Sequence, residues 1–379
     1  MTAERPLLTA AMIVRNEEGF LGPCLSSLAG LADELVIVDT GSTDASRDIA
    51  RSHGARLGEF PWTGDFAAAR NHALDLARGE WILWIDADER VLPFPRAELE
   101  RVLSARDVLA CRLWFTDLEG TTPHRKIRLW RNDPRLRFQG RIHENIATSI
   151  KAVVAEDGYE IADCEMEMTH LGYEGDISAK HRRNLPLLRQ RLEEAPGIIS
   201  NWLHLGGILT DLGEKEEAER VFVQAVALAR QSPDRHPREA ACYAELARSL
   251  AVTGGEPTPS RLAEAEAVLA QGLERHPGDR YLQWVDASYR MARGRFEEAV
   301  VILERLAGID GERFRDPKVA CDKRIFGEFA FDALGLCCFR LGRHAESAAW
   351  YASAEAVAPA RLEYRLRRIA AEQRARRAG

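Results

Sequence analysis

The sequence changes its hydrophobic pattern about halfway along, and this change constrains the fold more than any other feature. From Leu7 to about Gly172, short apolar or β-branched runs alternate with helical segments, which is typical of a mostly parallel sheet covered by helices. After about Asp176 the strand-like runs end, and pairs of helices rich in Ala, Leu, Glu and Arg follow. The pattern predicts an α/β domain over residues 1–176, a linker helix over 177–197 and an all-α domain over 198–379.

The length and composition suit two folded domains. The chain has 379 residues, 46% of them apolar and 29% charged, so each half can bury a core of its own. The formal net charge of −7 argues against a general nucleic-acid-binding protein, because such proteins present a basic face to the phosphates. We therefore expect no nucleic acid among the partners.

The cysteines and the first residues bear on location. Seven cysteines occur, an odd number, with no CxxC pair and no zinc-binding spacing, which favours a reducing compartment and a cytoplasmic protein. Residues 1–6 do not resemble a signal peptide, and no apolar run approaches the ~20 residues that a membrane span needs. We expect no transmembrane segment, so any membrane contact would be peripheral.

Polar residues follow each predicted strand of the α/β part. The predicted strands are Leu8–Val14, Glu34–Val38 and Trp81–Ile85, and the predicted helices are Phe20–Leu28, Ala45–His53 and Phe66–Ala77. Ligands of open α/β sheets bind outside the carboxyl ends of the strands, so the residues at those ends are candidates for binding.

The first two strand ends predict a nucleotide-binding nest. Asn16 and Glu17 follow the first strand, and Asp39 and Ser42 follow the second. An aspartate there can accept hydrogen bonds from a nucleoside base or ribose. The alternative is structural, because Ser42 or Asp44 could serve only to cap the next helix.

The third strand end predicts a cation site. The run from Trp81 to Ile85 leads directly into Asp86 and Asp88, two carboxylates on one side of an extended backbone. Mg²⁺ and Mn²⁺ prefer oxygen ligands and bring phosphates with them, so this pair suits a cation that holds a diphosphate. The alternative is a pair of carboxylates in a solvated turn.

A basic stretch lies inside this otherwise acidic protein. Its members, between His124 and His143, are Arg125, Lys126, Arg128, Arg131, Arg135, Arg137 and Arg141. The stretch is either a solvated loop face or a surface that contacts an anion.

The C-terminal part contains a repeated pattern of large and small residues. The first copy comprises Trp202, Leu205, Gly206, Leu209, Ala218, Phe222 and Ala225, and a second comprises Phe331, Leu334, Gly335, Cys338, Ser347, Tyr351, Ala354 and Pro359. A third copy begins at Tyr243 and continues past an insertion at 254–259, and a looser one includes Trp284 and Phe296. The pattern matches the tetratricopeptide consensus, in which small residues let antiparallel helices approach and large ones fill the space beside the next pair.

The N-terminal motifs, taken in order, resemble the family 2 glycosyltransferases with the A-type, Rossmann-like nucleotide-sugar-binding fold. They are AMIVRNEE, LVIVDTGSTD and FAAARNHALDLARGEWILWIDADE. The resemblance implies nucleotide-sugar contacts at Asn16, Glu17, Asp39, Ser42, Arg70, Asn71 and Asp86, and a metal-binding DxD motif at Asp86 and Asp88. The sequence departs from the family at Thr40, where many members carry a second aspartate.

The resemblance extends to the acceptor side. The run KIRLWRNDPRLRFQGRIHENI is similar to a segment of family members that are joined to tetratricopeptide repeats. Such enzymes invert the anomeric centre in one displacement and need one base, which we expect to be Glu144, with Asp117 in reserve. Glu144 as a structural ion-pair partner is the alternative. His170 lies where related enzymes return a histidine to the metal, and a structural histidine is the alternative there.

The resulting prediction is a metal-dependent hexosyltransferase that uses Mg²⁺ or Mn²⁺ and a nucleotide sugar, most readily a UDP-sugar. Its acceptor is expected to be a peptide or protein held by the repeats. One alternative acceptor is a lipopolysaccharide core, a wall polymer or a small glycoside. An alternative of another class is a non-catalytic repeat adaptor with a degenerate transferase domain. A nucleotidyltransferase is less favoured, because the first strand has no glycine-rich, lysine-containing phosphate loop.

Overall fold

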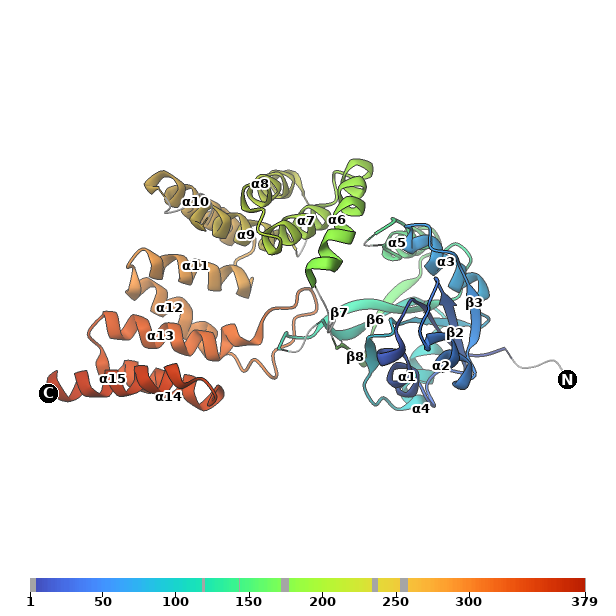
Figure 1. The fold of residues 1–379 in the computed structure, drawn as a ribbon, viewed down its shortest axis with the longest axis horizontal. Helices are drawn as coiled ribbons and strands as arrows, with labels where there is room; N and C mark the ends of the chain where they lie inside the picture. Colours follow the sequence, from blue (N-terminus) through green and yellow to red (C-terminus); the bar gives the residue numbers. More distant parts are fainter. Residues whose placement is uncertain are drawn as a thin grey trace. The chain divides into compact units, whose positions relative to one another are not determined.

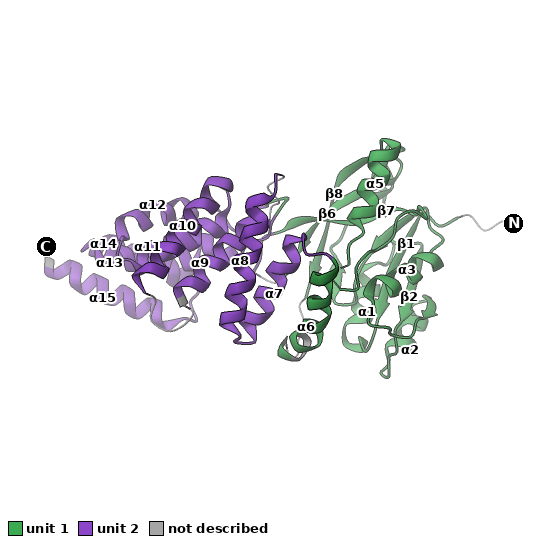
Figure 2. Ribbon diagram, turned by 90° about the horizontal axis from the view of Figure 1, so that it is seen from above, with its two compact units in different colours: residues 1–119, 123–194, 316–318 green, residues 120–122, 195–315, 319–379 purple. Residues whose placement is uncertain are grey.

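The computed structural model describes residues 5–117, 120–142, 144–171, 177–233, 238–252 and 258–378. These residues fall into two compact units (Figure 2). Unit 1 comprises residues 1–119, 123–194 and 316–318, and unit 2 comprises residues 120–122, 195–315 and 319–379. The predicted combination of an α/β part and an all-α part is confirmed.

Unit 1 is a single eight-stranded sheet with helices on both faces (Figure 1). The strands are β1 Leu8–Val14, β2 Glu34–Asp39, β3 Arg56–Glu59, β4 Trp81–Trp84, β5 Glu89–Val91, β6 Val108–Thr116, β7 His124–Arg131 and β8 Glu160–His170. The helices are α1 Glu18–Ser27, α2 Ser46–Ser52, α3 Phe66–Leu76, α4 Arg96–Leu103, α5 Ala147–Asp157 and α6 Ile177–Glu194. Helix α6 occupies most of the segment for which the sequence predicts a linker helix.

The sheet has a parallel half and a mixed half. Its strand order is β3-β2-β1-β4-β7-β6-β8-β5, and the first four of these strands are parallel. Strand β7 pairs antiparallel with both β4 and β6, whereas β8 runs parallel to β6 and antiparallel to β5. The predicted strands correspond to β1, β2 and β4. The mixed half was not predicted, because antiparallel pairing of distant segments leaves no local pattern.

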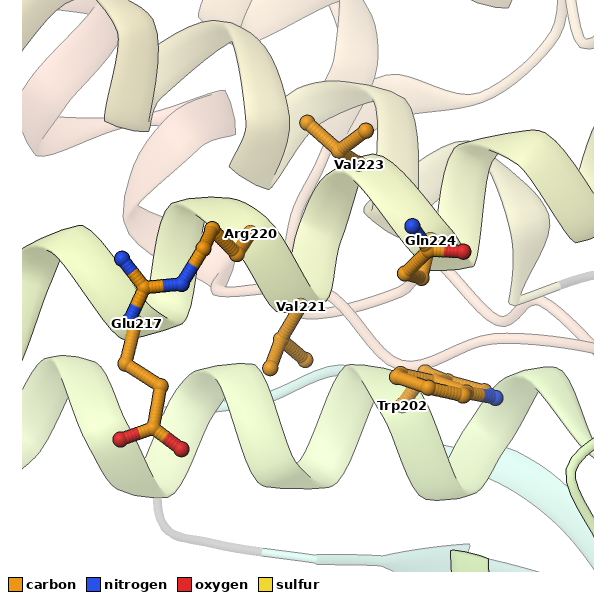
Figure 3. A pocket seen from close by; sticks show the side chains of 6 residues that line it. All are labelled: Trp202, Glu217, Arg220, Val221, Val223 and Gln224. Carbon is orange, nitrogen blue, oxygen red and sulfur yellow. The ribbon is translucent and has the colours of Figure 1, made fainter.

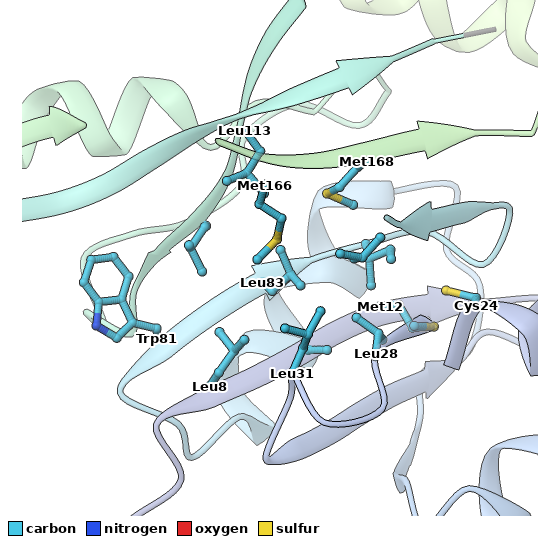
Figure 4. Packing of buried hydrophobic residues seen from close by; sticks show 14 of the residues in the cluster. Leu8, Met12, Cys24, Leu28, Leu31, Trp81, Leu83, Leu113, Met166 and Met168 are labelled. Carbon is cyan, nitrogen blue, oxygen red and sulfur yellow. The ribbon is translucent and has the colours of Figure 1, made fainter. Parts of the chain in front are cut away.

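Strands β1, β2 and β4 are buried on both faces, as expected for strands covered by crossover helices. Alternate residues of β1 and β4, such as Met12 and Leu83, pack with α1, α2 and α4 in one apolar core (Figure 4). The intervening residues, such as Ala11 and Trp84, pack with α3 and α5 in a second core. Both cores are close-packed, so the strand ends between them are held rigidly.

Unit 2 consists of antiparallel helix pairs. Its helices are α7 Ile199–Asp211, α8 Lys215–Gln231, α9 Glu239–Val252, α10 Pro259–Arg275, α11 Arg280–Ala292, α12 Phe296–Ala307, the 3₁₀ helix η1 Lys323–Phe326, α13 Glu328–Arg340, α14 His344–Val357 and α15 Leu362–Ala378. The predicted insertion at 254–259 lies largely outside the described residues.

The repeated glycines allow the paired helices to touch. A Cβ at Gly206 would lie 2.3 Å from the ring of Phe222, and one at Gly335 would lie 2.7 Å from that of Tyr351. These are the small and large positions of the predicted repeats. The packing reason for the pattern therefore holds in α7–α8 and in α13–α14.

A pocket of about 400 Å³ lies over α7 and α8, lined by Trp202, Glu217, Arg220, Val221, Val223 and Gln224 (Figure 3). Within the described part of the chain, no helix combines the length and the apolar character that crossing a membrane requires.

Candidate active site

The candidate residues lie at one edge of the sheet, beyond the carboxyl ends of β1, β2 and β4. These three strands are parallel neighbours, with β1 in the middle. The loops that leave them therefore emerge on the same side, where ligands of such sheets bind. The residues form two clusters, one behind β1 and β2 and the other behind β4.

The first cluster is a network of short loop contacts. Asn16 has a φ of 57°, and it is the only non-glycine among the described residues with a positive φ. Its side-chain oxygen accepts a hydrogen bond from the backbone N–H of Thr43 at 2.8 Å, and its backbone N–H donates to the Ser42 hydroxyl at 3.0 Å. The Glu17 amide donates to the Ser46 hydroxyl at 2.8 Å. Asparagine enters the left-handed region more readily than other non-glycine residues, and here that conformation places Asn16 against residues 42 and 43.

Asp39 anchors the same cluster from β2. Its side chain is fully buried and accepts hydrogen bonds from the Gly41 and Ser42 amides, both at 3.1 Å, and from Arg47 at 2.7 Å. Burial alone would raise the pKa of Asp39, but the bonds from Ser42 and Arg47 outweigh it and lower the pKa below its usual value. Asp39 is thus held as an anion in the loop.

Asp44 and Thr40 have structural roles in this loop. Asp44, and not Ser42, bonds to the first turn of α2, accepting from the Ser46 amide at 3.0 Å. Thr40, which stands where many family members carry aspartate, is buried and donates its hydroxyl to the Val14 carbonyl at 3.1 Å.

The second cluster is centred on Asp86. Its carboxylate accepts a hydrogen bond from Arg70 at 3.1 Å and lies 3.9 Å from a terminal nitrogen of Arg128. Burial would raise the pKa of Asp86, but Arg70 and Arg128 together lower it. The side chain is 30% exposed, so it is reachable by a ligand.

Arg70 connects Asp86 to Glu144. Its guanidinium carbon lies 4.2 Å from the centre of the Trp84 ring, and its Nε is ion-paired with Glu144. Asn71, next to it on α3, uses its whole amide group on Phe138, accepting from the backbone N–H at 2.8 Å and donating to the carbonyl at 3.0 Å. Asn71 therefore fixes the loop in front of Glu144. His143 lies outside the described residues.

His170 and Asp88 also belong to the second cluster. Nδ1 of His170 lies 2.7 Å from the carbonyl oxygen of Asp117, which can only accept, so Nδ1 carries a proton. Nε2 lies 2.9 Å from Oδ2 of Asp88, whose hydrogen bond raises the pKa of His170. Asp88 and the Nε2 of His170 are thus direct neighbours at the DxD motif. A histidine fixed through its other nitrogen in this way is the usual form of a metal ligand.

Sequence reasoning missed two members of the site, Glu89 and Arg128. Glu89 is buried in β5, accepts from the Asp86 amide at 2.9 Å and contacts Arg128 at 2.5 Å. Burial raises the pKa of Glu89 to about 7, against the opposing effect of Arg128. The signal was present in part, because Glu89 follows the DxD motif directly and Arg128 belongs to the basic stretch. The first half of that stretch, from 124 to 131, is strand β7, whereas Arg135, Arg137 and Arg141 lie in the loop that follows it.

The structure thus groups Asn16, Glu17, Asp39 and Ser42 in one cluster and Arg70, Asp86, Asp88, Glu144 and His170 in the other. Within the described ranges, no set of three or more His, Cys, Asp or Glu side chains is placed so that it could hold a metal ion.

The comparisons with known proteins concern the family of each part of the chain. Residues 9–154 match the model of glycosyl transferase family 2, and residues 199–232 match a tetratricopeptide repeat. A TPR repeat-containing protein of Synechococcus elongatus is 34% identical over 234 residues, which are 60% of this chain and 58% of that protein. The prophage-derived glycosyltransferase SunS of Bacillus subtilis is 26% identical over 235 residues, 57% of this chain and 52% of that protein.

A shorter match is to the lipopolysaccharide core biosynthesis glycosyltransferase LpsC of Rhizobium meliloti, 39% identical over 105 residues, 26% of this chain and 38% of that protein. The chain thus spans little more than half the length of the first two relatives. The matched family, the sheet and the strand-end clusters agree: the chain carries a glycosyl transferase family 2 domain, followed by tetratricopeptide repeats.

Proposed function

We propose that unit 1 is an inverting, metal-dependent glycosyltransferase that moves a hexose from a UDP-sugar to an acceptor. The observation that carries the proposal is the 2.9 Å contact between Asp88 and the Nε2 of His170, which brings a carboxylate and an imidazole to one point of the DxD motif. A nucleotide-sugar enzyme needs such a point for the cation that accompanies the diphosphate.

The donor set suits Mg²⁺ or Mn²⁺. Mg²⁺ is usually held by one or two carboxylates plus substrate phosphates, so a site with few protein ligands is what the proposal requires. Asp88 and His170 would hold the cation, with Asp86 beside them. A cation bound there would neutralise charge that develops on the departing diphosphate.

The first cluster is proposed to bind the nucleoside. Asp39 and Ser42, with Asn16 and Glu17, line the loops beyond β1 and β2. Arg70 is proposed to act at the diphosphate, and Asn71 to act indirectly, because its amide is used on the backbone of Phe138.

Glu144 is proposed as the base, with Asp117 in reserve. The acceptor nucleophile attacks the anomeric carbon, its proton passes to a Glu144 carboxylate oxygen, and the bond to the diphosphate breaks with its electron pair on the leaving group. Arg70 contacts both Glu144 and Asp86, so the proposed base lies one side chain away from the DxD motif. One displacement inverts the configuration.

The acceptor is proposed to be a peptide or protein bound through unit 2, since tetratricopeptide arrays suit extended peptides. A saccharide acceptor is the second candidate, and the match to a lipopolysaccharide core transferase supports it. No disulfide joins the described cysteines, which supports a reducing, cytoplasmic setting.

The test is a panel of nucleotide sugars with Mn²⁺ or Mg²⁺, read by release of nucleoside diphosphate, first without an acceptor and then with peptide and saccharide acceptors. Asp88→Ala should abolish turnover, and Glu144→Gln should abolish turnover while donor binding persists. Unchanged turnover in Glu144→Gln would move the base to Asp117. Absence of any donor binding by the wild type would leave only the repeat adaptor.

A further inference from the structure

The basic stretch separates into two groups once its partners are known. Five of its cations bind carboxylates or carbonyls away from the DxD motif: Arg125, Arg131, Arg135, Arg137 and Arg141. Lys126 and Arg128 both lie over the ring of Phe115, so they share one side of β7. Lys126 is ion-paired with Asp117, and Arg128 alone reaches the carboxylates behind β4.

Arg128 is mostly buried and incompletely bonded. Its side chain is 14% exposed, and Glu89 is the only hydrogen-bond acceptor it meets among the residues that the structure describes. Its other terminal nitrogen lies 3.9 Å from Asp86, beyond hydrogen-bonding distance. A guanidinium has five N–H donors, so Arg128 keeps donors available at the DxD motif.

Glu89 determines where Arg128 points. One carboxylate oxygen contacts Arg128 and the other accepts the Asp86 amide, so a single buried side chain joins the DxD turn to β7. The ring of Phe115, 4.9 Å from the guanidinium carbon, adds a second contact. Arg128 is therefore held beside Asp86 before any ligand arrives.

We propose that Arg128 binds the diphosphate of the donor and that Glu89 is the positioning residue that aims it there. The proposal rests on the proposed function of this site. A planar guanidinium suits two phosphate oxygens at once, and its fixed charge stabilises the leaving group without a proton transfer. Arg128 would thus act from the side of β7, whereas Arg70 acts from α3.

The test compares the affinities of UDP and UMP by calorimetry with the full chain and Mn²⁺. Arg128→Gln should weaken UDP binding about 10- to 100-fold, the range for a hydrogen bond to a charged group, and should weaken UMP binding far less. Arg128→Lys keeps the positive charge but loses the planar guanidinium that can bond two phosphate oxygens. Its UDP affinity should therefore lie between those of the wild type and Arg128→Gln. Because Arg128→Lys leaves Glu89 and Asp86 with a cation, it tests the proposal even if Arg128→Gln folds poorly.

Arg137→Gln is the matched control. Arg137 belongs to the same stretch and pairs with the exposed Asp75, so its loss removes the same charge without touching the site. It should leave both affinities unchanged. Equal losses of UDP and UMP affinity in Arg128→Lys would mean that Arg128 only supports the fold, and unchanged UDP affinity would mean that it serves an acceptor anion. Either result would overturn the proposal.

Glu89 is tested by a double-mutant cycle. Glu89→Gln can still accept from the Asp86 amide but loses its charge toward Arg128, so UDP affinity should fall. In the Arg128→Gln background the same change should have no further effect on the ratio of UDP to UMP affinity. Additive effects would show that Glu89 does not act through Arg128. If the wild type binds neither nucleotide, the proposed function itself is wrong. If the wild type binds UDP and the variants do not behave as described, only the role of Arg128 and Glu89 is wrong.

Discussion

A methyl group added at Gly206 tests the packing of the first repeat. The new Cβ would lie 2.3, 2.6 and 2.8 Å from three ring atoms of Phe222, whereas carbon atoms pack best at about 3.5–4.0 Å. The ring or one helix must therefore move by about 1 Å. Overpacking of a core costs about 1–3 kcal/mol, and this contact belongs at the upper end. The helix-forming preference of alanine returns about 1 kcal/mol, so Gly206→Ala should lose about 2 kcal/mol.

Gly207 is the matched control, because it is the next residue of the same helix and a Cβ there would meet nothing within 4 Å. Gly207→Ala should instead stabilise α7 by up to about 1 kcal/mol. Amide hydrogen exchange over residues 199–231 measures both changes locally, without assuming that the two units unfold together. Exchange that slows in both variants, or quickens in both, would refute the packing argument.

Three further predictions concern unit 1 and the thiols. Asn71→Ala leaves the N–H and carbonyl of Phe138 without their partners, so it should cost about 2 kcal/mol and lower the thermal midpoint; an unchanged midpoint would contradict this. The pKa of Asp39 is lower in the folded state than in the unfolded chain. The ionised Asp39 carboxylate therefore stabilises the fold above the unfolded-state pKa, and this stabilisation is lost as pH falls through the folded-state pKa. Acid unfolding of Asp39→Asn should lack that part of the pH dependence. Of the seven cysteines only Cys321 is not buried, so a thiol reagent should modify one group in the native protein and seven after denaturation.

The order of elements and the first cluster could be predicted from the sequence because their signals are local. A buried strand followed by Asp86 and Asp88, or by Asp39 and Ser42, is visible within ten residues, and the strand ends of a parallel sheet meet by topology. The repeats were equally accessible, since Gly206 and Phe222 are small and large members of one consensus. The fold class and the family resemblance are confirmed on these features.

The contacts of Glu89 could not be predicted, because they depend on β7 lying beside β4. That pairing joins segments about fifty residues apart, and the sequence around Arg128 contains no local pattern that predicts it. The same holds for Asn71, whose sequence context suggested a ligand contact while its partner is the backbone of Phe138, 67 residues away. A single sequence does not predict antiparallel pairing between distant segments.

The bonds between Asn71 and Phe138, with the ion pair between Arg70 and Glu144, limit how this domain can be re-engineered. A chimera that exchanges only residues 132–146 would import a carboxylate without the helix that orients it. Exchange of residues 66–76 in the same step would bring along Arg70 and Asn71, the residues that hold Glu144 and Phe138. Exchanges between relatives should therefore give a folded domain when both segments move together, and should fail when either is moved alone.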